Sequence, residues 1–341
     1  MKRRTALKSA FALSAVLALG SLPVHAEDFK SRTLRLGIQN PKGHPAELGA
    51  RRFGELVEQG SGGKIKVRVF AGGVLGGDQQ TVSSLQGGTI DMTVLNSGIL
   101  ASHVKEMAVY DFPFLFQNER EVEAITDGPI GKGFHERLAD VGLIGLGYWE
   151  LGFRHITNSA RAVEKVEDLA GLKLRVIPNP INLDWVKAFG ANPVPLAFPE
   201  VYTALEQKVV DGQENPLTVI AANKFFEVQK YLTLTYHQYN PQSIIISKRV
   251  WDGMSAAEQA LIASAATEAG AYQRKLARDE AEGALNALRN GGMQVTELSE
   301  AELARLREKL QPVIATHTDS VGAETVQQVQ AAIDAVRAAG K

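Results

Sequence analysis

The 341-residue chain contains no cysteine. This absence excludes disulfide frameworks, thiolate metal sites, iron–sulfur clusters held by cysteine and cysteine nucleophiles. The 37 lysines and arginines are matched by 38 aspartates and glutamates, so the chain lacks the basic excess typical of nucleic-acid-binding domains. The composition therefore predicts no nucleic-acid partner. Hydrophobic residues make up 45% and charged residues 22%, which is typical of an ordinary globular protein.

Most catalytic signatures are also missing. The sequence has no GxxxxGK[ST] phosphate loop, no GxGxxG fingerprint and no GxSxG nucleophile elbow. No two of the seven histidines lie three or four positions apart, as a helical metal pair would need. The sequence thus predicts no cofactor, no metal site and no catalytic residue. Paired acidic residues leave a periplasmic enzyme acting on an organic acid as an open alternative.

The N-terminus has the three parts of an export signal. Four basic residues lie within the first eight positions, residues 10–22 are apolar, and Val24 and Ala26 are small residues before a possible cleavage site. The apolar stretch is shorter than the ~20 residues that span a bilayer, and a short core helix is the alternative. We expect a signal peptide at 1–26 and a protein in the periplasm. Both the general and the twin-arginine routes stay open.

Beyond the signal, predicted strands alternate with predicted helices, which favours an α/β protein with mixed sheets flanked by helices. A turn rich in glycine precedes Asp78, which is expected to cap the helix that follows it. The strands are expected at 33–39, 64–70, 92–95, 143–148 and 172–177, and the helices at 45–59, 79–85, 199–208, 255–290, 298–314 and 325–339.

The middle of the chain repeats the strand and helix order of its beginning, which favours two similarly built lobes. The predicted division places 27–151 and about 241–280 in lobe I, and 152–240 and about 281–341 in lobe II. The long helix at 255–290 is expected to brace both lobes.

Polar residues at strand ends are the candidates for ligand binding, because ligands of open α/β sheets bind at the carboxyl ends of the strands. Arg175 precedes the turn at Pro178, and its guanidinium has the fork of donors that matches a carboxylate. Arg154 offers the same chemistry. For both, a pair with a protein carboxylate is the alternative. Asn215 offers an amide, or else caps a helix after Pro216.

Several motifs resemble the solute-binding proteins of TRAP transporters. They occur in order along the chain: GVLGGD at 73–78, GTID at 88–91, DFPFL at 111–115, GLKLRVIP at 171–178, FPEVY at 198–202 and VDGQENP at 210–216. The resemblance covers essentially the whole chain after the signal. It implies a two-lobed periplasmic-binding-protein fold that captures an organic acid for a permease driven by an ion gradient, with one large and one small membrane subunit.

The resemblance also implies roles for single residues. Arg175 matches an arginine that forms a bidentate pair with the ligand carboxylate. Arg154 and Asn215 match an arginine and an asparagine that contact the same carboxylate. Phe198 matches an aromatic residue that packs on the ligand. The residues expected to contact the rest of the ligand are Asn40, Asp78 and Asn96, with His44 and Gln79 added as polar loop residues near them. The alternative interpretation of His44 is a solvated loop residue.

The ligand class is less well defined by the sequence. Sialic-acid binders that resemble this sequence carry an acid where Asn96 stands, which argues against sialic acid. The predicted lobe I residues can form hydrogen bonds with hydroxyl groups, but they include no second cation. A four-carbon dicarboxylate would favour a second cation for its second carboxylate. The hypothesis is therefore a sugar acid such as a hexuronate, and a four-carbon dicarboxylate or another hydroxy acid remains the alternative.

Overall fold

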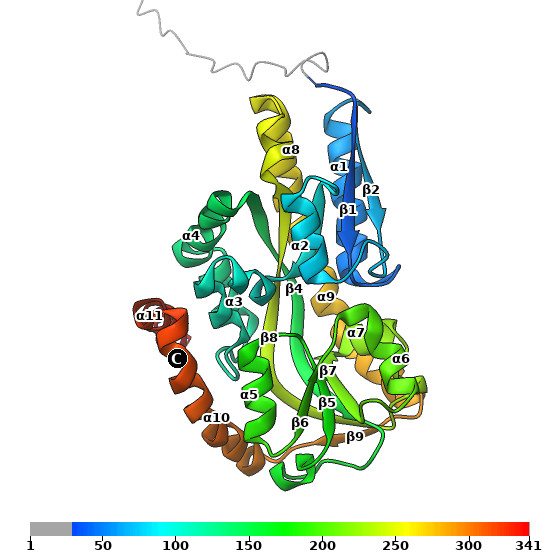
Figure 1. Cartoon of the computed structure of the whole chain (residues 1–341), viewed down its shortest axis with the longest axis vertical. Coiled ribbons are helices and arrows are strands. Elements are labelled where there is room, and N and C mark those ends of the chain that lie inside the picture. Colours follow the sequence, from blue (N-terminus) through cyan, green and yellow to red (C-terminus); the bar gives the residue numbers. More distant parts are fainter. Residues whose placement is uncertain (1–28, 341) are drawn as a thin grey trace, which may run out of the picture.

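A computed structural model describes residues 29–340, so the expected signal peptide at 1–26 lies outside the described residues. The chain first alternates strands and helices, as predicted (Figure 1). Helix α2 begins at Asp78 with Gly77 as its N-cap, so the prediction that Asp78 caps this helix was wrong by one residue. The first elements are β1 (Arg32–Ile38), α1 (Pro45–Gly60), β2 (Ile65–Phe70), α2 (Asp78–Gln86) and β3 (Met92–Asn96).

Short helices follow and cover the first half of the sheet. They form one apolar core in which Tyr110 packs edge-on against Phe134. These elements are η2 (Ser97–Ser102), η3 (Lys105–Asp111), α3 (Glu119–Thr126), α4 (Pro129–Arg137) and η4 (Leu138–Val141).

Two unusually long antiparallel strands, β4 (Leu143–Asn158) and β8 (Tyr231–Ser247), run through the whole molecule (Figure 1). The sequence predicted only the first third of β4 and none of β8. The reason is that both are buried over most of their length, and glycines in β4 and polar residues in β8 obscure the alternation on which a strand prediction depends. Register shifts near Gly145, Glu150 and Arg154 bend the pair.

The second half of the chain repeats the alternation between these long strands. Strands β5 and β7 run parallel, and β7 also pairs with β4. The elements are η5 (Val166–Leu169), β5 (Lys173–Val176), α5 (Pro180–Ala188), β6 (Asn192–Pro195), η6 (Phe198–Glu200), α6 (Val201–Glu206), β7 (Gly212–Pro216), α7 (Leu217–Ala222) and η7 (Phe225–Glu227).

All nine strands of the described chain belong to one mixed sheet, in the order β2-β1-β3-β8-β4-β7-β5-β6, with β9 (Gln294–Glu297) paired to β8. One end of the sheet carries β1, β2 and β3, and the other end carries β5, β6 and β7 (Figure 1). The two halves are therefore joined by the backbone of β4 and β8, which belong to both.

Helix α9 (Ala256–Asn290) packs on α1 in the first half and on α7 in the second, as expected of a helix that braces both lobes. Its start is specified locally by a capping box between Ser255 and Glu258. It continues unbroken through Gly270, where the indole of Trp149 lies against the helix. The short helix α8 (Lys248–Asp252) precedes it.

The last two helices pack on different halves of the molecule. Helix α10 (Glu300–Val321) packs on α5, but α11 (Ala323–Ala339) packs on α3, where Arg337 forms an ion pair with Glu121 at 3.0 Å. The predicted division places about 281–341 in lobe II. In the structure, Val329 and Ile333 of α11 are buried in the same apolar cluster as Val122 and Ile125 of α3. No helix within residues 29–340 combines the length and apolarity that a bilayer span needs.

Candidate functional site

A cavity of about 200 Å³ lies between the two halves of the molecule. The carboxyl ends of β1 and β3 reach it from the first half, and those of β5 and β7 reach it from the second, as expected for a ligand site in an open α/β sheet. Its described lining residues are Gln39, Asn40, Gly77, Asp78, Gln79, Gln80, Asn96, Ile99, Leu151, Arg175, Ile177, Pro178, Ala197, Phe198, Asn215, Val219 and Gln242.

Arg175 is the cation of this cavity, and its side chain is almost wholly buried. Its Nε and Nη2 both donate to the carbonyl oxygen of Leu196, at 3.0 and 2.7 Å, which holds the guanidinium in one orientation. Nη1 is buried and has no hydrogen-bond partner among the described residues. Burial lowers the pKa of Arg175 to about 10, so the group stays charged at neutral pH. The cavity therefore presents an oriented positive charge with an unused donor.

Two further predicted residues flank this charge. The ring of Phe198 lies 5.8 Å from the guanidinium carbon of Arg175, in the arrangement of a cation–π contact. Asn215 is part of strand β7, where its Nδ2 donates to Gln213 at 2.5 Å. It does not cap helix α7, whose N-cap is Pro216, so the alternative interpretation of Asn215 was wrong.

The opposite wall, from the first half and β8, is rich in unpaired oxygens. Four lining residues have a buried side-chain oxygen with no hydrogen-bond partner among the described residues. These atoms are Oε1 of Gln39, Oδ1 of Asp78, Oδ1 of Asn96 and Oε1 of Gln242. Buried polar atoms are seldom left unpaired in a folded protein, so this wall is suited to a ligand that brings hydroxyl donors.

Asp78 is the acid of the cavity. Burial raises the pKa of its carboxyl group to about 7, although the charge of Arg175 and a hydrogen bond involving Gln39 act in the opposite direction. Gln39 is itself held by donating from Nε2 to the carbonyl oxygen of Gly76 at 2.9 Å. The acid and its neighbour are thus positioned by the glycine turn between β2 and α2.

The rims of the cavity touch one another. A methyl group added at Gly77 would lie 3.2 Å from Cβ of Ala197, and one added at Gly73 would lie 2.7 Å from Cγ of Pro199. Gly73 and Gly77 belong to the first half, and Ala197 and Pro199 belong to the second. The two halves are therefore closed over the cavity at this rim.

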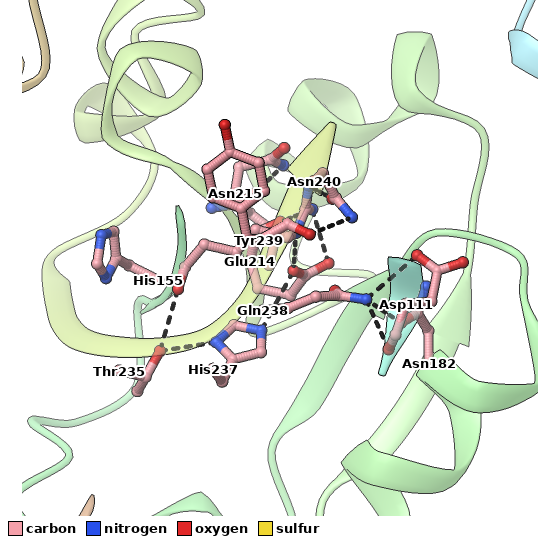
Figure 2. A network of polar contacts seen from close by, with 12 residues as sticks. Asp111, His155, Asn182, Glu214, Asn215, Thr235, His237, Gln238, Tyr239 and Asn240 are labelled. Carbon is pink, nitrogen blue, oxygen red and sulfur yellow. Dashed lines mark hydrogen bonds and ion pairs between the residues drawn. The ribbon is translucent and has the colours of Figure 1, made fainter. Parts of the chain in front are cut away.

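Arg154 does not line the cavity, contrary to the prediction. Its buried guanidinium forms an ion pair with Glu214 and donates from Nη1 to Oδ1 of Asn240 at 2.7 Å. Nη2 also donates to the Glu214 carboxylate at 2.9 Å. The alternative, a pair with a protein carboxylate, is what the structure shows, although the partner is buried rather than exposed. Figure 2 shows Glu214 and Asn240 in this network.

The network around Arg154 continues away from the cavity. Burial would raise the pKa of Glu214, but the charge of Arg154 and contact with His237 lower it to about 2. Nε2 of His237 lies 3.4 Å from the Glu214 carboxylate, and its Nδ1 shares a hydrogen bond with Thr235 at 2.8 Å (Figure 2). Burial lowers the pKa of His237, so Glu214 and Arg154 form the charged centre of this network.

His44 also lies outside the cavity lining. It is buried rather than solvated, and its Nδ1 accepts a hydrogen bond from the backbone nitrogen of Ala46 at 3.1 Å as the N-cap of α1. Seven of the nine predicted residues line the cavity, and Arg154 and His44 do not. The seven are Arg175, Asn215, Phe198, Asn40, Asp78, Asn96 and Gln79.

Sequence reasoning missed three polar lining residues. Gln39 directly follows β1 beside Asn40, so the same strand-end rule would have found it. Gln80 is one residue beyond Gln79 on α2. Gln242 lies within β8 opposite Asn96, and it was missed because that strand was not predicted. Within residues 29–340, no group of three or more acidic residues or histidines is arranged to hold a metal ion.

Residues 36–320 match the model of the family described as bacterial extracellular solute-binding protein, family 7. The chain belongs to this family. It is 37% identical over 281 residues to the 2,3-diketo-L-gulonate-binding periplasmic protein YiaO of Escherichia coli, which covers 82% of this chain and 86% of the relative. The predicted resemblance to the solute-binding proteins of TRAP transporters is thus confirmed.

Solved structures agree with the fold. A TRAP periplasmic solute-binding protein from Ochrobactrum anthropi is 51% identical, with a TM-score of 0.80 over 91% of this chain and 97% of that one. The sugar acid binding protein DctPAm from Advenella mimigardefordensis, in complex with galactonate, is 42% identical, with a TM-score of 0.89 over 90% and 99%. Other solved relatives hold D-erythronate, galacturonate or succinate. The two-lobed α/β fold is confirmed, and this chain is a solute-binding protein for small organic acids.

Proposed function

We propose that this protein is the periplasmic component of a TRAP transport system that captures a sugar acid, such as a hexuronate or an aldonate. The observation that carries the proposal is the orientation of Arg175. Its Nε and Nη2 donate to Leu196, and its buried Nη1 has no hydrogen-bond partner in the described part of the chain. A carboxylate needs such a partner when it is buried, because an unpaired buried charge is costly. In this proposal Arg175 binds the carboxylate, with the amide of Asn215 beside it and Phe198 packed on the ligand.

The rest of the ligand would face the first half. Hydroxyl groups would donate to the unpaired oxygens of Gln39, Asp78 and Asn96, which leaves fewer buried acceptors unsatisfied. Asn40 and Gln79 would complete this wall. Relatives that bind galactonate and 2,3-diketo-L-gulonate are consistent with this ligand class. A four-carbon dicarboxylate or another hydroxy acid is the alternative ligand.

The ligand would be captured by closure of the two halves. It contacts both halves only in the closed form, so it shifts the equilibrium between open and closed forms by its differential affinity. The closed protein would then be recognised by a permease with one large and one small membrane subunit and powered by an ion gradient. Export through the predicted signal peptide would place the protein in the periplasm.

We infer a binding role rather than an enzymatic one, with no cofactor. Among the described lining residues there is no histidine, serine, threonine or lysine that would pair with Asp78 in acid–base or nucleophilic chemistry. The alternative, a periplasmic enzyme acting on an organic acid, predicts turnover of the bound acid, which analysis of the acid after incubation with the protein would reveal.

The test is a thermal-shift screen of the protein without residues 1–26 against aldonates, uronates and dicarboxylates, because a ligand that binds the native state raises the melting temperature. We expect one or more sugar acids to stabilise the protein. The variant Arg175→Ala should weaken binding of that acid by ~3–5 kcal/mol, as expected when a buried ion pair loses one partner. Unchanged affinity in this variant would contradict the proposed role of Arg175.

Transport itself requires a second experiment. Cells that express the protein together with the large and small membrane subunits encoded by neighbouring genes should accumulate the acid. Cells that lack the binding protein should not. Accumulation that depends on an ATPase instead of an ion gradient would assign the protein to another class of importer.

A further inference from the structure

The charges in the cavity are distributed unequally between the two halves. Among the described lining residues, Arg175 of the second half is the only base and Asp78 of the first half is the only acid. A ligand that bridges the halves and places its carboxylate on Arg175 therefore presents its remaining groups to the wall of the cavity that carries Asp78. This inference rests on the proposed function, which orients the carboxylate.

Among the described lining residues, no cation besides Arg175 is available to a second carboxylate near Asp78. Within residues 29–340, Oδ1 of Asp78 is buried without a hydrogen-bond partner, and Gln39 and Asn96 add two further unpaired oxygens on the same wall. The positive residue that acts on Asp78 is Arg175 itself, which the first carboxylate of the ligand would neutralise. Asp78 is held in place as the first residue of α2, behind the turn that contacts Ala197 across the rim.

We propose that Asp78 makes this protein selective for acids with a single carboxylate and rejects acids with a carboxylate at both ends. A terminal hydroxyl group donates a charge-assisted hydrogen bond to the Asp78 carboxylate. When Asp78 is ionised, as at pH 8, a terminal carboxylate at the same place has no proton to donate, and its negative charge faces that of Asp78 in a closed, water-poor site. The selectivity thus separates aldonates from the aldarates that differ only by oxidation of the terminal carbon.

The test uses pairs of acids that share a carbon skeleton. Galactonate is compared with galactarate, and erythronate with meso-tartrate, by calorimetric titration at pH 8. We expect the wild-type protein to bind the monocarboxylate of a recognised pair at least 100-fold more tightly than its dicarboxylate. The variant Asp78→Asn keeps the shape and removes the charge, and it should reduce this ratio at least tenfold, mainly because the dicarboxylate binds better.

A matched control removes one acid outside the cavity. Asp140→Asn changes the net charge by the same amount at an exposed position and should leave the ratio unchanged. Circular dichroism of each variant checks its fold, and Asp78→Ser serves as a second variant without the charge. An unchanged ratio in both Asp78 variants would overturn the proposal.

Two other outcomes separate this proposal from the proposed function. If the wild-type protein binds galactarate or succinate as well as any monocarboxylate, the selectivity is refuted while the acid-binding role stands. If no organic acid in either series or in the thermal-shift screen binds, the proposed function is refuted, and the selectivity with it.

Discussion

Arg154 and Arg175 lie on strands that flank β7 on its two sides, yet their environments differ. Arg154 pairs with Glu214 and Asn240 inside the protein. Arg175 lines the cavity and donates to one carbonyl oxygen, and its buried Nη1 has no hydrogen-bond partner among residues 29–340. Burial is nearly complete for both, so burial does not distinguish them. A buried arginine is therefore available for a ligand only where the protein leaves part of its guanidinium unpaired.

The acids near the two arginines differ in the same way. Glu214, which pairs directly with Arg154, has its pKa held at about 2 against the effect of burial. Asp78, which faces Arg175 without direct contact, has its pKa raised by burial to about 7. The carboxylate of Glu214 is thus paired within the protein, whereas the carboxyl group of Asp78 is available to a ligand in the cavity.

The largest expected effect comes from breaking the internal pair. Arg154→Met leaves Glu214 buried without its cation and should lower the free energy of unfolding by ~3–5 kcal/mol. Urea unfolding followed by circular dichroism measures this loss. The double variant Arg154→Met with Glu214→Gln removes the stranded charge and should recover part of the stability. A single variant within 1 kcal/mol of wild type would contradict the structural role of Arg154.

A change at the other arginine should affect binding instead of folding. Arg175→Lys keeps a positive charge but loses the planar fork, so the affinity for the identified acid should fall about 10- to 100-fold. The unfolding free energy should fall less than in Arg154→Met, because lysine keeps the charge and the main lost contacts are the hydrogen bonds to Leu196. Calorimetry and urea unfolding on the same samples separate the two effects. Equal losses of stability at Arg154 and Arg175 would break the comparison.

The rim offers a smaller perturbation that leaves both arginines untouched. Gly77→Ala places a methyl group 3.2 Å from Cβ of Ala197 and should hinder closure, which weakens binding about fivefold, or roughly 1 kcal/mol. Removing the opposing methyl group in the double variant Gly77→Ala with Ala197→Gly should restore most of the affinity. A double variant that binds no better than Gly77→Ala would show that this contact does not limit closure.

The last prediction is a pH dependence that distinguishes the two acids. Because the pKa of Asp78 is raised in the folded protein, the folded state binds more protons than the unfolded state between about pH 4 and 7, and this contribution to stability is lost as pH rises through about 7. The melting temperature of wild type relative to Asp78→Asn should therefore fall from pH 5 to pH 8.

Glu214 should act in the opposite direction. Its pKa is lowered, so its contribution is present above about pH 4.5 and is lost as pH falls toward 2. Melting curves of the wild type and of Glu214→Gln from pH 2 to 6 measure it, with Asp140→Asn as the surface control. A wild type that gains stability relative to Glu214→Gln on acidification would contradict the lowered pKa.

Some elements could be predicted because their signals are local. The alternation in β2 and the run of helix-forming residues in α9 are each visible in a continuous stretch of sequence, and both elements occur as expected. Strand β8 gave no such signal, since it is buried almost throughout and carries polar residues that are satisfied or used only in the folded protein. Gln242 was missed with it, although it lies opposite Asn96 in the sheet.

The alternation of strands and helices, the family motifs and the polar residues at strand ends could be recognised from the sequence alone, because these depend on neighbouring residues or on a shared pattern. Only the tertiary structure decided which arginine is free. Arg154 and Arg175 have the same chemistry and similar positions on their strands. They differ because Arg154 forms an ion pair with Glu214 of β7, whereas Arg175 lines the cavity. Such long-range pairing cannot be read from any short stretch of sequence.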